Sequence, residues 1–462
     1  MRVSRAKFKG RVKATLDLEF TSKGITSYAG LEILLRYVRR LRLRGRLRAM
    51  GRRLNLGGDV QFASMIMLFV GMLVIGLRRL RQVRYVADDP LVRRFASLRE
   101  VPCDRTLSRF LKRFSKAEWE QLERFNRELV LDSLERQDLR RLTLDMDGSV
   151  LSTGLQVERA FRGFNPHHRK NPSYYPLTIQ VSQTGQVLAH QNRSGDVHDS
   201  TGAARLLERS VRSLRGRGHE GIIEFRADSA FFQRAILEAC DRHRLEYAIK
   251  VPLWPWLGIR ELIRKNAPDD WTTVDRANRV EGFSMDLPVK PWSRVERVGV
   301  FRKRVNHKTR KDLQLDLFHP DDGHWEYSVI ASNKDLQLPA MWRFAHGHAA
   351  QERCYAELKG EYAYAAIPTS SYAANTTWQK LNILAYNLVT SFQIDIVAEQ
   401  RLGSRSRTAL FLLRSVRTIR FEWLNKAGRL INRSGRRVLR IGARLGARRR
   451  FEELDRALPK AA

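Results

Sequence analysis

Three acidic residues stand at positions where a carboxylate is costly unless a cation compensates it. Asp147 ends a strand-like stretch, Asp228 follows a second such stretch, and Glu352 interrupts a helical one. Carboxylate oxygens are the hard ligands that Mg²⁺ prefers, and two such ions can activate the attacking oxygen and stabilise the leaving oxygen of a phosphodiester. The three residues are therefore candidate ligands of a two-metal site, provided that the fold brings them together.

Each of these residues also has a plain structural interpretation. Asp147 could belong to a turn, and Asp145, on the same face of the alternating strand, is then the rival ligand. Asp228 could cap the helix that follows it. Glu352 could be an exposed helical acid, with Glu357 as its rival.

Two other groups of metal-binding residue types are weaker candidates. One is a polar stretch between a strand and a helix, where a turn is favoured over a metal site: Asp196, His198 and Asp199. The other is the set of three cysteines, which lie more than a hundred residues apart with no paired spacing: Cys103, Cys240 and Cys354. We therefore predict neither a disulfide framework nor a zinc site.

The charge of the chain predicts a polyanionic partner. Its 462 residues carry 85 Lys and Arg against 49 Asp and Glu, a formal charge of +36. The first 58 residues hold 16 basic and 3 acidic side chains, and residues 401–462 hold 18 and 4. Two basic terminal segments flank a nearly balanced centre, which is typical of arms that hold nucleic acid; an anionic membrane is the competing partner.

The composition, 43% hydrophobic and 29% charged, is that of a globular protein and excludes wholesale disorder. One uncharged run of 18 residues, Val60–Leu77, would span about 27 Å as a helix, the short end for a bilayer. It contains Gln61 and Ser64 and stands alone, so we predict a buried helix and no membrane contact. The N-terminus shows no signal peptide, which predicts a cytoplasmic protein.

Hydrophobic periodicity divides the chain into regions of different structure. Helical spacing dominates the first region, strands and helices alternate in the core, and an insertion rich in tryptophan and short strands splits that core. The predicted regions are 1–138, helical and DNA-binding; 139–251, first part of an α/β core; 252–325, β-rich insertion; 326–400, second part of the core; and 401–462, a basic helical C-terminus.

Four motifs follow one another along the chain: Asp147-Gly-Ser-Val within LTLDMDGSV, the stretch NRSGDVHDSTGA, Arg226-Ala-Asp228-Ser-Ala-Phe, and Glu352 followed by Tyr355, Leu358 and Lys359. Together they resemble the DDE transposases of insertion sequences, in the group called transposase DDE domain group 1, of the cut-and-paste type with a β-strand insertion before the glutamate. The resemblance extends from about Gly30 to about Arg440.

The resemblance implies a fold and an activity. The fold is an RNase H-like core interrupted by the β-rich insertion, with an all-helical N-terminal region and a basic helical C-terminus. Asp147, Asp228 and Glu352 would bind two Mg²⁺, or Mn²⁺, and water or a DNA 3′-hydroxyl would attack the phosphodiester at the element ends. The partners implied are the terminal inverted repeats, target DNA and a second copy of the chain in a homodimer, in the bacterial cytoplasm at the nucleoid.

The resemblance also indicates residues that contact DNA. Lys359 matches the lysine of the family's tyrosine-arginine-glutamate-lysine signature, whereas His348 and Ala345 replace its arginine and tyrosine. His348 would share the helix face of Glu352 and could donate to a phosphate. The residues predicted to bind DNA are Lys359, His348, Arg226, Trp292, Arg436 and Arg437.

Trp292 is included because an aromatic in this insertion could stack on a base flipped out of a DNA hairpin. Trp254 and Trp256 are rivals for that role, and for each of the three tryptophans a place in the hydrophobic core is favoured. Two other functions stay open: a related metal-dependent nuclease, and a DNA-binding descendant that has lost catalysis. Nicking of DNA that carries element ends would separate them.

Overall fold

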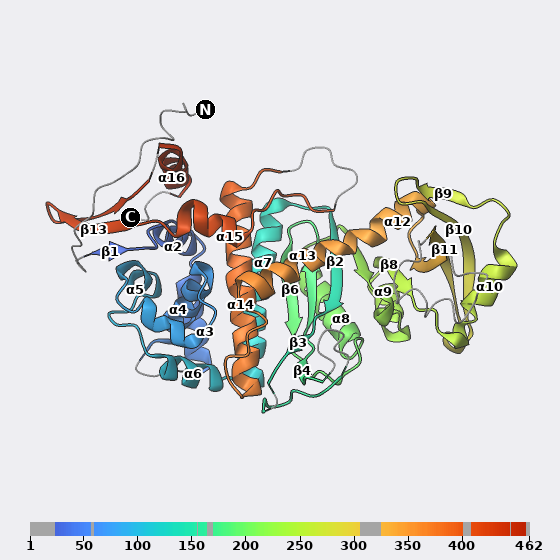
Figure 1. Cartoon of the computed structure of the whole chain (residues 1–462), viewed down its shortest axis with the longest axis horizontal. Helices are drawn as coiled ribbons and strands as arrows, with labels where there is room; N and C mark the ends of the chain where they lie inside the picture. The colour runs from blue at the N-terminus through green and yellow to red at the C-terminus, as the bar shows by residue number, and fades with distance from the viewer. Residues whose placement is uncertain are drawn as a thin grey trace, which may run out of the picture.

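The computed structural model describes residues 24–56, 60–154, 156–163, 170–304, 325–400, 408–443 and 445–458. Parts of the predicted regions therefore lie outside the described residues, namely 1–23, 57–59, 155, 164–169, 305–324, 401–407, 444 and 459–462. Figure 1 shows the N-terminal helices at one end of the long axis, a sheet in the middle and the strands of residues 272–304 at the other end. The C-terminal residues return to the N-terminal helices.

The described residues before the sheet are helical apart from one short strand, β1 (Ile25–Thr26). The caps explain where two of the helices begin: Asp89 accepts hydrogen bonds from the first turn of α5, and Ser115 and Glu118 form a capping box at α7. The helices are α2 (Leu31–Arg40), α3 (Leu43–Arg53), α4 (Phe62–Ile75), α5 (Pro90–Ala96), α6 (Asp104–Lys112) and α7 (Lys116–Gln137).

Helix α4 occupies the uncharged run, and all 14 of its residues are buried. It packs against α3, α5 and the long helix α14 (Tyr372–Phe392). The contact with α5 is close, because a Cβ at Gly71 would lie 2.9 Å from the ring of Phe95. Among the described residues no helix is long and apolar enough to cross a membrane. The prediction of a buried helix is confirmed.

Nine of the described strands form the largest sheet, in the order β6-β5-β2-β7-β8-β12-β11-β10-β9. β2 is parallel to β7, and β7 is parallel to β8, whereas the other neighbouring pairs are antiparallel. The strands are β2 (Arg141–Gly148), β5 (Leu177–Val181), β6 (Gln186–Gln191), β7 (Ile222–Ala227), β8 (Glu246–Val251), β9 (Thr272–Asp275), β10 (Val280–Val289), β11 (Arg294–Arg304) and β12 (Trp325–Ser332).

Strand β2 directs two kinds of side chain to opposite faces of the sheet, as its alternation predicts. Leu144 and Met146 are fully buried in the core beneath α8 (Ala203–Gly216) and α9 (Arg234–Arg242). Asp145 and Asp147 face the other way, toward α12 (Leu338–His346) and α13 (Ala350–Glu361). The carboxylates therefore lie on the face that carries the candidate glutamate helix.

Helix α14 joins the N-terminal helices to the sheet. It contacts α4, α6 and α7 as well as β6, and its polar residues find partners inside the molecule. The Lys380 ammonium lies 2.8 Å from the Glu123 carboxylate in a buried ion pair, and Asn387 donates to the carbonyl of Val187 at 2.7 Å. The helix therefore fixes the sheet edge rigidly against the helical region.

The strands of residues 252–304 do not form a sheet of their own. β9, β10 and β11 extend the central sheet through β12, which pairs with β8 in the register Val329 to Val251. A helix, α10 (Ile259–Asn266), lies before them. The strand content agrees with the composition of this stretch, and the sheet continues without interruption from the candidate site into it.

The predicted basic helical C-terminus is only partly helical: α15 (Val416–Ile419) and α16 (Leu445–Ala457) are present, but a strand hairpin lies between them. Strands β13 (Gly428–Arg433) and β14 (Arg436–Ile441) form a hairpin, and β13 also pairs with β1. Ser434 and Gly435 both have positive φ, 49° and 76°, as a tight two-residue hairpin turn requires. The remaining strands are β3 (Leu151–Ser152) and β4 (Ser173–Tyr174).

Candidate active site

The candidate site lies where two neighbouring parallel strands end. Asp147 is the last residue but one of β2 and Asp228 directly follows β7, so both carboxylates reach the same edge of the sheet. Burial raises the pKa of Asp147 to about 7, and the Asp228 carboxylate adds to the rise while His348 opposes it. Asp147 is thus a desolvated carboxylate with a second negative charge beside it.

Asp228 has a cationic partner of its own. Its carboxylate lies 2.8 Å from the Nζ of Lys250, which belongs to the adjoining strand β8. Burial alone would raise the pKa of Asp228, but Lys250 and the charges of His348 and His346 hold it below the usual value. The two aspartates therefore differ: one is ionised and paired, and the other is buried and poorly compensated.

Helix α13 is anchored by three of its side chains to β2, to the neighbouring strand β5 and to the residues that follow β2. Tyr355 donates to the carbonyl of Asp147 at 2.8 Å, Gln351 donates to the hydroxyl of Thr178 at 3.1 Å, and Lys359 donates to the carbonyl of Val150 at 3.2 Å. Burial lowers the pKa of Lys359, while the nearby Asp147 raises it. This face of α13 is therefore the face that approaches the first aspartate.

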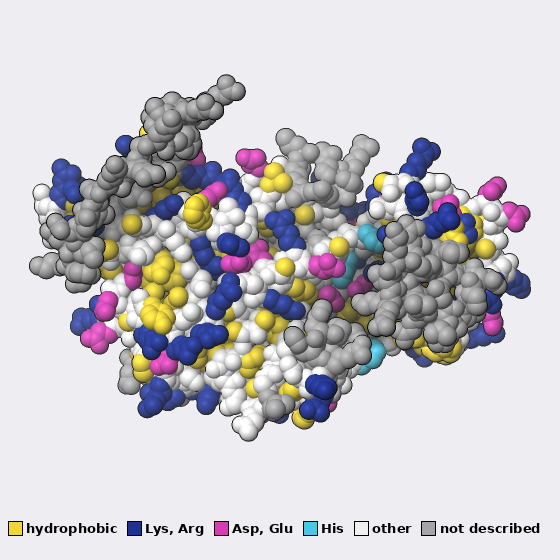
Figure 2. Space-filling model, viewed as in Figure 1, with side chains coloured by type: hydrophobic (Ala, Val, Ile, Leu, Met, Phe, Trp, Pro, Cys, Tyr) yellow, Lys and Arg dark blue, Asp and Glu magenta, His cyan; other side chains and the backbone are white. Residues whose placement is uncertain are grey.

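His348 lies just before α13, and its Nε2 is 3.0 Å from the carbonyl of Met146. It contributes positive charge to both aspartates. Figure 2 shows histidine and acidic side chains together on this face, between the central part and the strands at the far end. The structure thus brings together the predicted residues Asp147, Asp228, His348 and Lys359.

The two candidate glutamates of α13 differ in position. Glu352 is exposed, and the structure does not group it with the aspartates: among the described residues, no three His, Cys, Asp or Glu side chains are close enough to hold a metal ion. Glu357 faces the opposite side, where its carboxylate accepts a hydrogen bond from the backbone of Val416 at 2.7 Å. Burial raises the pKa of Glu357.

The burial of Arg226 contradicts the prediction that it contacts DNA. Its side chain is 0% exposed and forms two hydrogen bonds with Asp145, which is equally buried. It also donates to the carbonyl of Phe344 at the end of α12 and to the hydroxyl of Thr408. Asp145 is therefore committed to Arg226, which removes it as the rival metal ligand and leaves Asp147.

We expect Asp145→Asn to lower the free energy of unfolding by about 3 to 5 kcal/mol, because it leaves the buried Arg226 guanidinium without its counter-charge. Asp335→Asn is the matched control, since Asp335 pairs with Arg297 at 3.0 Å but is 95% exposed, and its loss should cost about 0 to 1 kcal/mol. Denaturant unfolding followed by tryptophan fluorescence measures both. An equal loss of unfolding free energy in the two variants would show that the buried Asp145–Arg226 pair stabilises the fold no more than the exposed Asp335–Arg297 pair does.

Asp199 is an acidic neighbour that the sequence pattern assigned to a polar turn. It accepts a hydrogen bond from the hydroxyl of Tyr175, and its charge contributes to the raised pKa of Asp147. Arg193, only 4% exposed, fixes the turn by donating to the carbonyls of Tyr175, Asp199 and Thr201. Nothing in the spacing of these residues places them beside Asp147; only the folded chain does.

Trp292 lies in a group of aromatic rings close to Asp228. Its ring centroid is 5.3 Å from that of Phe232, four residues after Asp228, and 5.7 Å from that of Trp256. Trp254 and Trp256 stack at 5.5 Å, and Trp256 is 49% exposed. The group is thus partly core and partly surface, and Trp256 is its most open member.

Arg436 and Arg437 lie away from the aspartates. Both are exposed on β14, in the hairpin that packs near the N-terminal helices. Figure 1 shows this hairpin at the end of the molecule opposite β9 and β10. If these arginines contact DNA, they do so on a surface separate from the candidate site.

Comparison with models of protein families identifies the family of the chain. The model of the family described as transposase DDE domain group 1 matches residues 8–462. The chain belongs to this family. The comparison with curated proteins finds no match for this transposase.

A solved structure similar to this transposase is the cryo-EM structure of the piggyBac transposase synaptic complex with hairpin DNA. The two chains share 14% identity, the similarity covers 81% of this chain and 77% of the other, and the TM-score is 0.41. That TM-score is too low to support an inference about the site.

The aspartates of this transposase fit a divalent cation. Their oxygens are hard ligands, they meet at one sheet edge, and the pKa of Asp147 is raised first by burial and also by the charge of Asp228. Lys250 neutralises only Asp228. A cation bound at Asp147 would supply the missing charge.

Proposed function

We propose that this transposase binds the ends of an insertion sequence and cleaves and joins DNA by metal-dependent phosphoryl transfer. The observation that supports this most is the meeting of Asp147 and Asp228 at the ends of adjoining parallel strands, in a chain of the DDE family. In this proposal β6, β5, β2, β7 and β8 are the strands of an RNase H-like core.

Asp147 and Asp228 would hold Mg²⁺ or Mn²⁺, and Glu352 would complete the ligand set when DNA is bound. The metal, when bound, lowers the pKa of an attacking water and stabilises the leaving oxygen. The chain itself positions α13 through Tyr355 and compensates phosphate charge through Lys359. No side chain is needed as the general base.

The other parts of the proposal follow from the same reaction. His348 donates to a phosphate in place of the family's arginine, and Trp292 or its neighbour Trp256 stacks on a base near Asp228. Cutting two element ends together calls for two copies of the chain, so we propose a homodimer on the inverted repeats. DNA cleavage and joining would take place at the bacterial nucleoid, in the cytoplasm.

The test is incubation with DNA that carries the element's own ends, with Mg²⁺ or Mn²⁺, followed by mapping of the cleaved strands. Cuts at the element ends that depend on the metal support a transposase. Cuts elsewhere would indicate the related nuclease.

One observation favours a second candidate, a DNA-binding descendant without catalysis. Glu352 is exposed and apart from the aspartates, and Ala345 and His348 replace two residues of the family signature. Metal-dependent binding of the ends with no strand cut under any condition would support this second function.

We expect divalent-metal binding at this site to weaken as the pH falls below about 7, because a proton then occupies the Asp147 carboxyl. Below that pH the affinity for Mn²⁺, followed by electron paramagnetic resonance, should drop about tenfold per pH unit. Asp147→Asn should abolish this dependence.

Two aspartates in the same polar turn, Asp199 and Asp196, provide a test variant and its control. Asp199→Asn should move the inflection to lower pH, because the charge of Asp199 raises the pKa of Asp147. Asp196→Asn should leave it in place, since Asp196 is exposed and bonds only to Ser194 among the described residues. An affinity for Mn²⁺ that is constant around pH 7 would contradict the role of Asp147.

A further inference from the structure

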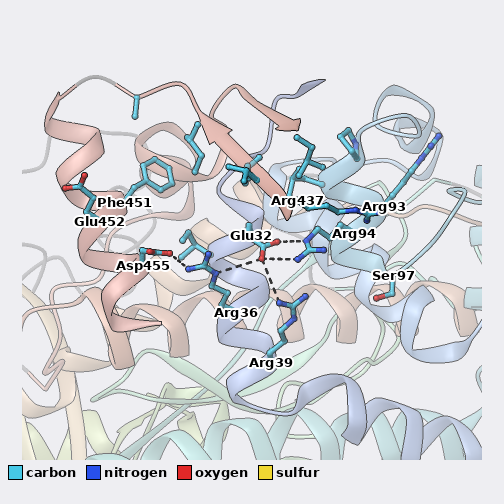
Figure 3. Close-up of a pocket in the computed structure, with 18 of the residues that line it drawn as sticks. Glu32, Arg36, Arg39, Arg93, Arg94, Ser97, Arg437, Phe451, Glu452 and Asp455 are labelled. Carbon is cyan, nitrogen blue, oxygen red and sulfur yellow. Dashed lines mark hydrogen bonds and ion pairs between the residues drawn. The ribbon is translucent and has the colours of Figure 1, made fainter. Parts of the chain in front are cut away.

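A groove of about 960 Å³ lies far from the aspartates, between the N-terminal helices and the C-terminal hairpin. Its walls are α2 and α5 on one side and β13, β14 and α16 on the other. Figure 3 shows arginine side chains from both walls directed toward its centre. The candidate site does not use this groove.

The groove exists only because the two ends of the chain come together. Ile25 of β1 pairs with Arg429 of β13, and the backbone of Ala29 donates to the carbonyl of Lys426 at 2.9 Å. Arg36 of α2 forms an ion pair with Asp455 of α16. The described parts of the two basic terminal segments therefore build one surface.

The charge of the groove is unbalanced. Six arginines line it against three carboxylates. Glu32 alone serves three guanidinium groups: Arg94 at 2.7 Å, and Arg36 and Arg39 at 3.9 Å each. Figure 3 shows Glu32 in the middle of these three arginines. Arg36 also pairs with Asp455, and Arg93 and Arg448 have carboxylate partners of their own. Glu32 is thus left to Arg94 and Arg39, and because one carboxylate cannot neutralise both guanidinium groups, positive charge remains.

Arg437 adds to the excess from the opposite wall. It is exposed on β14, and among the described residues no carboxylate lies within ion-pair distance of it. Arg44, which lies outside the groove, has a pKa lowered to about 10 first by burial and then by the charges of Arg39, Arg48 and Arg94. The groove thus favours an anion with several charges.

Apolar side chains lie between these arginines, including Leu439 of β14 and Phe451 of α16. A DNA strand offers what such a surface needs, since its phosphates suit the planar guanidinium groups and its deoxyribose faces suit the apolar side chains. An acidic protein segment would match the same charge. We choose DNA as the occupant because the proposed function requires this chain to hold DNA.

We propose that this groove binds the sugar–phosphate backbone of DNA and is the end-holding site of the transposase, separate from the site that cuts. The inference rests on the proposed function and adds to it the surface on which DNA is held. Arg39 and Arg437 contribute one phosphate contact each from facing walls. Glu32 keeps Arg36 and Arg94 oriented toward the strand.

The test is the double variant Arg39→Gln/Arg437→Gln, with binding of a short linear duplex followed by fluorescence anisotropy across a range of salt concentrations. Losing two phosphate contacts should weaken binding about tenfold and reduce the log–log salt slope by about 1.8. Arg39→Lys/Arg437→Lys keeps the charge and should keep the slope. The matched control, Arg212→Gln/Arg297→Gln, removes two partly exposed arginines elsewhere and should bind within about twofold of wild type.

The outcomes separate this inference from the proposed function. Wild-type protein that fails to bind DNA overturns the proposed function itself. If wild type binds DNA, two results would contradict the proposal for the groove: a salt slope of Arg39→Gln/Arg437→Gln equal to that of wild type, or an equal loss of affinity in the control variant. The groove would then bind another partner. Unchanged melting temperatures of all variants show that the fold is intact.

Discussion

Replacing Asp147 or Asp228 with asparagine is expected to abolish DNA cleavage while DNA binding stays near the wild-type level. Each change removes a charged oxygen ligand at the sheet edge where β2 and β7 end. Changing a residue that only supports a metal ligand already costs about 10–100-fold, so losing a ligand should cost more. The basic surfaces are unchanged, which is why binding should persist.

Stability provides the control for Asp147→Asn. The folded pKa of Asp147, about 7, lies above its ordinary value of 3.8, so ionising this carboxyl destabilises the fold as the pH rises from about 4 to about 7. Asparagine carries no charge and avoids that loss. Above pH 7 the variant should therefore melt at the same temperature as wild type or higher, yet be inactive.

Three results would contradict this prediction. Wild-type cleavage by either variant would show that the carboxylate is not a ligand, and a lower melting temperature would mean that the activity was lost through unfolding. Asp196→Asn, an exposed change near the same edge, should cleave normally. If it were inactive as well, the loss would not be specific to the aspartate pair.

The sequence predicted these aspartates because their signals are local. Alternation along β2 puts Asp145 and Asp147 on one face, and each candidate aspartate ends a stretch that the pattern identifies as a strand. No local signal could decide whether Asp145 or Asp147 is the metal ligand. The choice depends on the parallel pairing of β2 with β7, which sets Asp145 opposite Arg226, 81 residues away.

The error about Arg226 has the same origin. Beside an aspartate in a basic chain, an arginine is expected to face DNA, and no local pattern shows that its strand is buried on both faces. The error about the C-terminal hairpin has a different cause. Short stretches of alternating arginine and apolar residues fit a helix or a strand equally well, and the Ser434–Gly435 turn was the signal that favoured strands.

The last prediction concerns the glutamate that completes the site. An α-helix turns about 100° per residue, so Tyr355 and Lys359 lie within about 60° of Glu352, whereas Glu357 points about 140° away. Tyr355 and Lys359 contact the carbonyls of Asp147 and Val150. Glu352 is exposed and apart from the aspartates, but it lies on the same side of α13 as Tyr355 and Lys359. Glu357 lies on the side that packs against Val416.

We expect Glu352→Gln to eliminate cleavage and Glu357→Gln to stay within a few-fold of wild type, because glutamine at 357 still offers an oxygen to the backbone of Val416. Lys359→Ala should weaken end binding or cleavage, since it removes a cation next to Asp147. Strand mapping on end-containing DNA measures all three. An inactive Glu357→Gln together with an active Glu352→Gln would mean that α13 presents its other face to the metals when DNA is bound.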